Sequence, residues 1–190
     1  MRLEIVQGDL LEGHEDGLVL TVDGAARGME GNLARLFCRQ YPDAWEDIED
    51  RIVYPIPLGS AQLFEVDPDI GSRFRFVFIA STLHHLGALS EEQKLAIQGN
   101  ALRTVLSLGE RNGLRSIATA LMVGGWRLEA PHALDQMVAT YLRALSQSAR
   151  TPLLRVRILE LPLYQTLAEH VLSSCDRAVL LDTCVCIRCP

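Results

Sequence analysis

Two uninterrupted apolar runs constrain the fold most strongly. Residues 17–23 read Gly-Leu-Val-Leu-Thr-Val-Asp, and residues 74–82 are rich in aromatic and aliphatic side chains. Short runs of this kind are typical of strands that are buried on both faces of a sheet. Such a sheet needs helices packed against both of its faces. The sequence therefore predicts an α/β protein.

Segments with helical periodicity alternate with these strands. Ser90 followed by Gln93 is a capping box that predicts the start of a helix, and Pro131 is typical of the first turn of another. The order of elements predicts a three-layer α/β/α sandwich with a mixed, mostly parallel central sheet. Further strands are predicted around Ile5 and at residues 60–66, 116–123 and 154–161, with further helices after Asn32, around Trp45 and at 163–174.

Length and composition limit the classes of protein that remain. The chain has 190 residues, of which 48% are hydrophobic and 22% charged. It is long enough for one substantial core, too short for two domains and too apolar to be disordered. With no long apolar segment and no signal peptide in its first residues, it is expected to be cytoplasmic and without a membrane partner. We predict a single domain over residues 1–175 and a Cys-rich C-terminal tail over residues 176–190.

The charge argues against nonspecific binding of nucleic acid. The formal net charge is −6, whereas binding to a phosphate backbone needs a concentrated basic face. A small anionic ligand remains compatible with this charge, because the backbone amides of a helix N-terminus bind phosphate without a basic side chain.

Four of the five cysteines lie between Cys175 and Cys189. Two interpretations stay open: Cys186 and Cys189 form half of a zinc site, or the thiols are incidental residues of a frayed tail. We expect the chain to have no metal ligands and no cofactor.

Glycines and acids gather at the predicted ends of strands, where ligands of α/β sheets bind. Asp9 follows the first strand, a loop from Asp23 to Gly31 follows the second, and Gly124-Gly125 follows a later one. Glycines allow a ligand to approach the backbone, and a helix after Asn32 would turn its free amides toward a diphosphate. Glycines are also common in ordinary turns and helix entries, so this motif alone leaves both interpretations open.

The order of the motifs resembles the macro domain family. Gly8-Asp9-Leu10 resembles the Gly-Asp-Ile of that family. Residues 28–37, continuing to Pro42, resemble the Met-Gly-x-Gly-Ile-Ala-x-x-Phe…Pro stretch of one branch. That branch contains the terminal ADP-ribose glycohydrolases and the antitoxins that remove ADP-ribose from DNA. Residues 116–118, leading to Gly124-Gly125, are similar to its second phosphate loop, and the resemblance covers roughly residues 3 to 162.

The resemblance implies binding of ADP-ribose or a related nucleotide diphosphate, with adenine at Asp9 and the diphosphate between the two loops. The expected partner is ADP-ribose or an ADP-ribosylated macromolecule, and nucleic acid only as an ADP-ribosylated substrate. Two of these residues have a structural alternative to ligand binding. Asp9 could accept hydrogen bonds from turn amides, and Trp126 could anchor its loop against the core. The ligand-binding residues expected from the resemblance are Asp9, Gly28, Met29, Gly31, Asn32, Val123, Gly124, Gly125 and Trp126.

Catalysis is less clearly implied, because the family's catalytic asparagine and lysine positions are substituted. Asp23 stands where macro domains end an Asn-rich segment, and His84 lies where the branch has a lysine. Asp23 and His84 are the candidates for activating water in an ADP-ribosyl hydrolase. Their alternatives are an Asx turn for Asp23 and polar surface for His84. The alternative function is a degenerate macro fold that binds proteins, with residues 178–187 as the edge of a homodimer.

Overall fold

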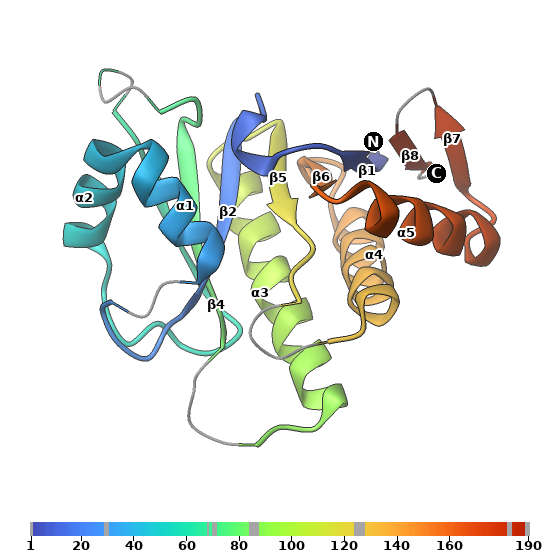
Figure 1. Ribbon diagram of the computed structural model, residues 1–190, viewed down its shortest axis with the longest axis horizontal. Coiled ribbons are helices and arrows are strands. Elements are labelled where there is room, and N and C mark those ends of the chain that lie inside the picture. The colour runs from blue at the N-terminus through green and yellow to red at the C-terminus, as the bar shows by residue number, and fades with distance from the viewer. Residues whose placement is uncertain are drawn as a thin grey trace.

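Helices cover both faces of one mixed sheet, as Figure 1 shows. The computed structural model describes residues 2–28, 31–67, 69, 72–83, 88–123, 128–181 and 184–188. Within these residues the sheet has eight strands in the order β3-β4-β2-β5-β6-β1-β8-β7. The three-layer α/β/α architecture with a mostly parallel sheet is confirmed.

The centre of the sheet is parallel and its edges are antiparallel. β2 has the bounds that the sequence predicts, whereas β5 ends at Ala120 instead of residue 123. Beyond Ala120 the chain leaves the ladder and turns, with the amide of Val123 donating to the carbonyl of Leu121 at 2.8 Å. The parallel strands are β4 (Phe76–Leu83), β2 (Gly17–Asp23), β5 (Ser116–Ala120), β6 (Leu153–Ile158) and β1 (Arg2–Gln7), and the antiparallel ones are β3 (Ala61–Glu65), β7 (Ala178–Leu181) and β8 (Cys184–Arg188).

Each face of the sheet packs against its own group of helices. On the first face lie α3 (Glu91–Arg111), α4 (Ala130–Gln147) and α5 (Leu161–Ser174). On the second face lie α1 (Asn32–Gln40), α2 (Pro42–Arg51) and the short 3-10 helix η1 (Leu10–Glu12). The capping box at the start of α3 is present, with the amide of Ser90 donating to Oε1 of Gln93 at 2.9 Å. None of the described helices is long and apolar enough to cross a membrane.

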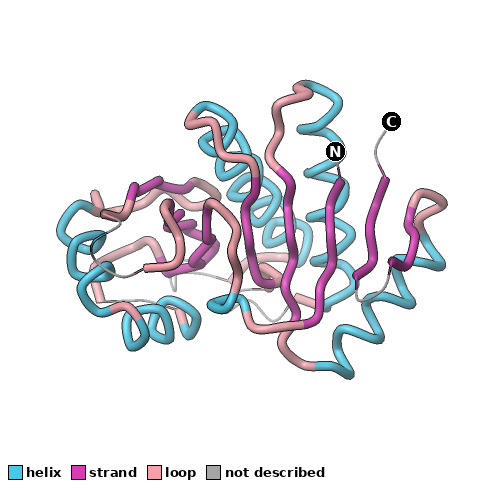
Figure 2. Tube along the Cα trace, turned by 90° about the horizontal axis from the view of Figure 1, so that it is seen from above, coloured by secondary structure: helices cyan, strands magenta, loops and turns pink. Residues whose placement is uncertain are grey.

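The C-terminal hairpin extends the sheet beyond β1. β8 pairs antiparallel with β1, placing Val185 opposite Ile5, and β7 pairs with β8. Figure 2 shows β8, the last described strand, lying beside β1, the first. The domain boundary predicted at residue 175 falls between α5 and this hairpin, and the pairing with β1 joins residues 178–188 to the sheet.

The hairpin also carries two of the cysteines and the free edge of β7. The Sγ atoms of Cys184 and Cys186 lie 3.2 Å apart. No cluster of three or more metal-ligating side chains occurs among the described residues. Leu180 and Leu181 on β7 are exposed. Self-association through this hairpin stays a prediction.

Candidate functional site

The candidate site lies at the carboxyl edge of the parallel strands. The segments that follow β1, β2, β5 and β6 leave the sheet at this edge, because these strands run in the same direction. They carry Asp9, the loop that begins at Gly24, residues 121–123 and Leu159. The topology therefore brings together residues that are far apart in the sequence.

Asp9 accepts a hydrogen bond from a turn amide and also lines a cavity, so its position is compatible with both interpretations given above. Its Oδ1 accepts a hydrogen bond from the amide of Leu11 at 2.9 Å, which caps the first turn of η1. The same residue lines a cavity of about 240 Å³ together with Gly8. A carboxylate has several acceptor sites, so the bond to Leu11 leaves capacity for a ligand donor.

The walls of this cavity, which we call the Asp9 cavity, are largely apolar. Leu33 and Leu36 come from α1, and Leu159 comes from the segment after β6. Leu159 is 65% exposed, which is unusual for a leucine and places it at the rim. Aliphatic walls with a carboxylate at one end suit a flat, uncharged ring that carries a donor on its edge.

A second cavity adjoins the first. It has a volume of about 330 Å³ and is lined by Val123 and by the starts of α4 and α5 at Ala130 and Leu163. Ala120, Arg157 and Leu159 line both cavities. Val123, one of the ligand-binding residues expected from the sequence, thus lies across this pair of cavities from Asp9.

The loop that enters α1 approaches the end of β2 closely. Gly28 has φ +82°, a conformation that favours glycine, and Gly31 is the N-cap residue of α1. A Cβ at Gly31 would lie only 2.6 Å from the carbonyl oxygen of Thr21, so any side chain there would force the helix away from β2. Among the described residues no side chain caps α1, so the first amides of the helix, from Asn32, have no side-chain acceptor there.

Asp23 is the last residue of β2 and is 6% exposed. Its Oδ1 accepts a hydrogen bond from the amide of Ala25 at 2.9 Å, which is the Asx turn considered as the alternative. β5 and β6 separate β2 from β1, so Asp23 and Asp9 lie about 14 Å apart across the sheet edge at ordinary strand spacing. The two carboxylates therefore lie apart along the carboxyl edge of the sheet.

A network of charged side chains holds Arg157, which lines the Asp9 cavity. Oε1 of Glu15 accepts from Nη2 of Arg157 at 2.9 Å and from Nη1 of Arg155 at 2.6 Å. Nε of Arg155 donates to Oε2 of Glu4 at 2.8 Å. Burial alone would raise the pKa of Glu15, but the hydrogen bonds from Arg155 and Arg157 outweigh it and keep that pKa below its ordinary value. Glu15 is therefore a carboxylate that holds both guanidinium groups in place.

Solved structures share this architecture. No protein-family model matches the sequence, and no significantly similar curated protein was found. A variant of the Oceanobacillus iheyensis macrodomain has a TM-score of 0.75 and 16% identity, over 89% of this chain and 90% of that one. The macrodomain of Mycobacterium tuberculosis DarG has a TM-score of 0.62 and 22% identity, over 82% of this chain and 98% of that one. The Trypanosoma brucei macrodomain in complex with ADP-ribose has a TM-score of 0.70 and 17% identity, over 88% of this chain and 68% of that one. This chain has the macrodomain fold.

Five residues of the expected site lie outside the part of the chain that the structure describes. They are Met29 in the first loop, His84 after β4, and Gly124, Gly125 and Trp126 in the second loop. The described members, Asp9, Asp23, Gly28, Gly31, Asn32 and Val123, all follow or adjoin the ends of β1, β2 and β5.

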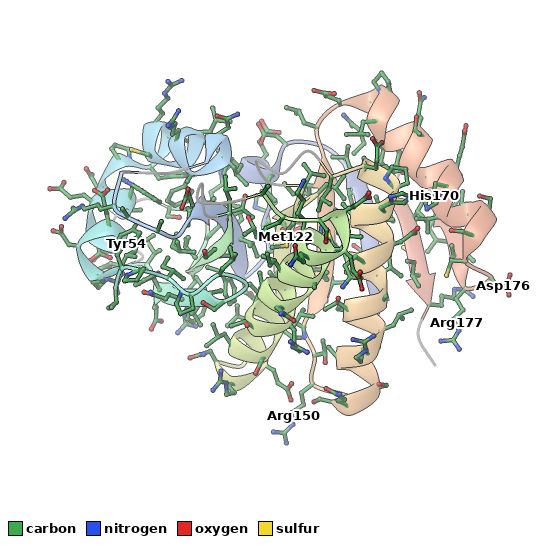
Figure 3. The ribbon with its side chains drawn as sticks, turned by 90° about the horizontal axis from the view of Figure 1, so that it is seen from below. Tyr54, Met122, Arg150, His170, Asp176 and Arg177 are labelled. Atoms are coloured by element: carbon green, nitrogen blue, oxygen red, sulfur yellow. The ribbon has the colours of Figure 1, made fainter. Side chains whose placement is uncertain are left out.

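The structure adds residues to the candidate site that no motif of the sequence had indicated. Arg157 lines the Asp9 cavity, Glu15 binds its guanidinium group, and Gln98 contacts the segment that follows β5. Nε2 of the buried Gln98 donates to the carbonyl oxygen of Met122 at 2.9 Å. Met122 lies near the middle of the molecule in Figure 3. The alternation in residues 154–158, Leu-Arg-Val-Arg-Ile, was the available sign that one face of β6 carries charge.

Proposed function

We propose that this chain binds ADP-ribose or a related nucleotide diphosphate along the carboxyl edge of its sheet. The observation that carries the proposal is the Asp9 cavity, which has apolar walls and opens at the same edge as the uncapped start of α1. The base would enter between Leu36 and Leu159 with an amine toward Asp9. The diphosphate would lie against the amides that begin at Asn32.

The solved structures give this proposal independent support. The Trypanosoma brucei macrodomain was solved with ADP and with ADP-ribose, and the Oceanobacillus iheyensis macrodomain was solved with ADP. Each of them shares the fold of this chain with a TM-score of 0.69 to 0.71. The same fold therefore holds this class of ligand in other proteins.

Calorimetry with ADP-ribose tests the proposal. We expect saturable binding by the full chain, weakened about tenfold by Asp9→Ala, because a ligand donor loses a charged acceptor. Asp67→Ala is the matched control. Asp67 also accepts a hydrogen bond from the amide two residues later at 2.9 Å, but it follows β3, away from the carboxyl edge. Absence of binding heat at millimolar ADP-ribose with folded protein would contradict the proposal.

Removal of ADP-ribose from a modified macromolecule is the finer proposal, and Asp23 is the group proposed to activate water. It supplies a buried carboxylate at the end of β2, opposite the base end of the site. We expect Asp23→Asn to retain ADP-ribose binding and to stop release of ADP-ribose from a modified substrate. Equal release by the variant and the parent protein would show that Asp23 is not this base.

A further inference from the structure

Strand β8 carries two cysteines on one face. Val185, which lies between Cys184 and Cys186, belongs to the buried cluster on the first face of the sheet. The alternation of a strand therefore turns both cysteines toward the second face. Both are thiols in the structure, and their Sγ atoms lie 3.2 Å apart. Two thiols in contact are placed to form a disulfide when an oxidant removes two electrons.

The two thiols differ in their access to solvent. Cys184 is half-buried, whereas Cys186 is only 1% exposed. A dissolved oxidant therefore reaches Cys184 first. Cys186 is already in contact with the sulfur that has reacted, and a partner held in place reacts much faster than a thiol that arrives from solution. The pair thus consists of an attacking and a resolving cysteine.

The extended backbone of β8 makes a bond between them strained. A strand rises by about 3.4 Å per residue, so the Cα atoms of Cys184 and Cys186 lie roughly 6.8 Å apart. This separation is at the upper end of the range that disulfides span, about 4.4 to 6.8 Å. Strained disulfides are readily reduced again, which is a property of regulatory rather than structural ones.

The strain of closure falls on the pairing between β8 and β1. Drawing the two cysteines together shortens the backbone at Val185, which is fully buried and lies opposite Ile5 of β1. The reduced pair leaves this ladder regular, and the oxidised pair weakens it. Oxidation would therefore loosen the attachment of the C-terminal hairpin to the sheet.

We propose that Cys184 and Cys186 form a reversible redox site whose oxidant is a small disulfide such as oxidised glutathione. The thiolate of Cys184 attacks one sulfur of the oxidant, whose S–S bond breaks, and one glutathione leaves and takes up a proton. The sulfur of Cys186 then attacks that of Cys184, and the second glutathione leaves with the proton of Cys186. The cysteines lose two electrons, and the oxidant becomes two thiols. Neither cysteine lines the Asp9 cavity, so this site is independent of the proposed function.

Oxidation of the full chain in a glutathione buffer, followed by blocking of the remaining thiols and tryptic digestion, tests the site. Cleavage after Arg177 and Arg188 releases residues 178–188, which contain both cysteines of the site and no other. We expect this peptide to lose the mass of two hydrogen atoms and to carry no blocking group. Treatment of the oxidised protein with excess reduced glutathione should restore both thiols.

Single substitutions assign the two roles. Cys186→Ala should stop the reaction at the mixed disulfide, so that one glutathione stays attached to Cys184. Cys184→Ala should leave the peptide unoxidised, because the accessible thiol is gone. Cys175→Ala is the matched control, since Cys175 is also half-buried but follows α5 and lies on a different tryptic peptide. This variant should be oxidised like the parent protein.

Hydrogen exchange of the reduced and oxidised parent protein measures the effect on the sheet. We expect the amides of residues 184–188 and 2–6 to exchange faster after oxidation, and those of β2 to be unchanged. Equal exchange in both states would overturn the coupling to the sheet. Glutathione that stays attached to Cys184 of the parent protein, a peptide cross-linked to Cys175 or Cys189, or two unreacted thiols would overturn the redox site itself.

Discussion

The second face of the sheet is built differently over its two halves. Over β2 and β4 it is apolar, and residues such as Leu20 and Ile79 are fully buried in the cluster beneath α1 and α2. Over β1 and β6 the same face carries Glu4, Arg155 and Arg157, which pair with one another and with Glu15. The apolar half positions the start of α1, and the charged half contributes Arg157 to the lining of the Asp9 cavity.

The two halves of the sheet therefore have different tasks: the apolar half holds a helix in place, and the charged half lines a cavity. Apolar packing is not directional and tolerates no solvent, so it suits the part of the sheet that holds a helix in place. Charged side chains in fixed hydrogen bonds are directional, so they suit the part that lines the Asp9 cavity, where we propose that a ligand binds. The two halves should therefore respond differently to substitution and to pH.

The largest effect is expected in the apolar half. Leu20→Ala should lower the free energy of unfolding by about 3 kcal/mol, because it leaves a cavity in a closely packed core. Urea denaturation measures this change, and the exposed Val53→Ala serves as the control. A loss as small as that of the control would show that this half is not the rigid support we describe.

In the charged half, Glu15→Gln should lower the free energy of unfolding by about 2 kcal/mol at neutral pH. It leaves the guanidinium group of Arg157 without its carboxylate and Arg155 with Glu4 alone, and the partial exposure of both arginines reduces the penalty. Urea denaturation at several pH values checks this prediction.

The pH dependence distinguishes charge from packing. Because the pKa of Glu15 in the folded state lies below its ordinary value of 4.5, its contribution is fully present above that pH. It is lost as the pH falls through the folded-state pKa, so the parent protein and Glu15→Gln should converge in strongly acidic solution. A difference that stays constant with pH would show that Glu15 acts through packing alone.

The smallest effect is expected on the first face, between the helices α3 and α4. The hydrogen bond to Glu91, 2.8 Å from Nδ1 of His132, raises the pKa of this exposed histidine. Any stabilisation is present below the ordinary pKa of 6.5 and is lost as the pH rises through the higher folded-state value. His132→Ala should therefore lower the Tm by only about 1 °C at pH 6 and by less at pH 9. A larger change, or one that grows with pH, would contradict the assignment of this pair to the surface.

The local patterns of the sequence predicted the centre of the fold well. The bounds of β2 and the capping box of α3 depend on neighbouring residues, and both were found as expected. The pairing of β8 with β1 was missed, because it joins the two ends of the chain and no local pattern marks it. The hydrophobic residues of 178–187 were visible in the sequence, but their position in the sheet was not.

The same reasoning explains what was predicted of the site. Asp9 and the glycines of the first loop follow strands directly, so their place at the sheet edge follows from the topology. Arg157 was missed because its importance depends on Glu15 and Gly8, which lie far from it in the sequence. Buried ion pairs between distant segments have no local sequence pattern.

A titration of the isotopically labelled protein with ADP-ribose, followed by backbone amide NMR, tests the central claim most directly. The account predicts that the largest shifts occur at residues 8–11, at 31–33 and at 121–123, which surround the two cavities and the start of α1. Shifts confined to α2 or to the hairpin of β7 and β8, or no shifts at all with folded protein, would contradict a nucleotide site at the carboxyl edge.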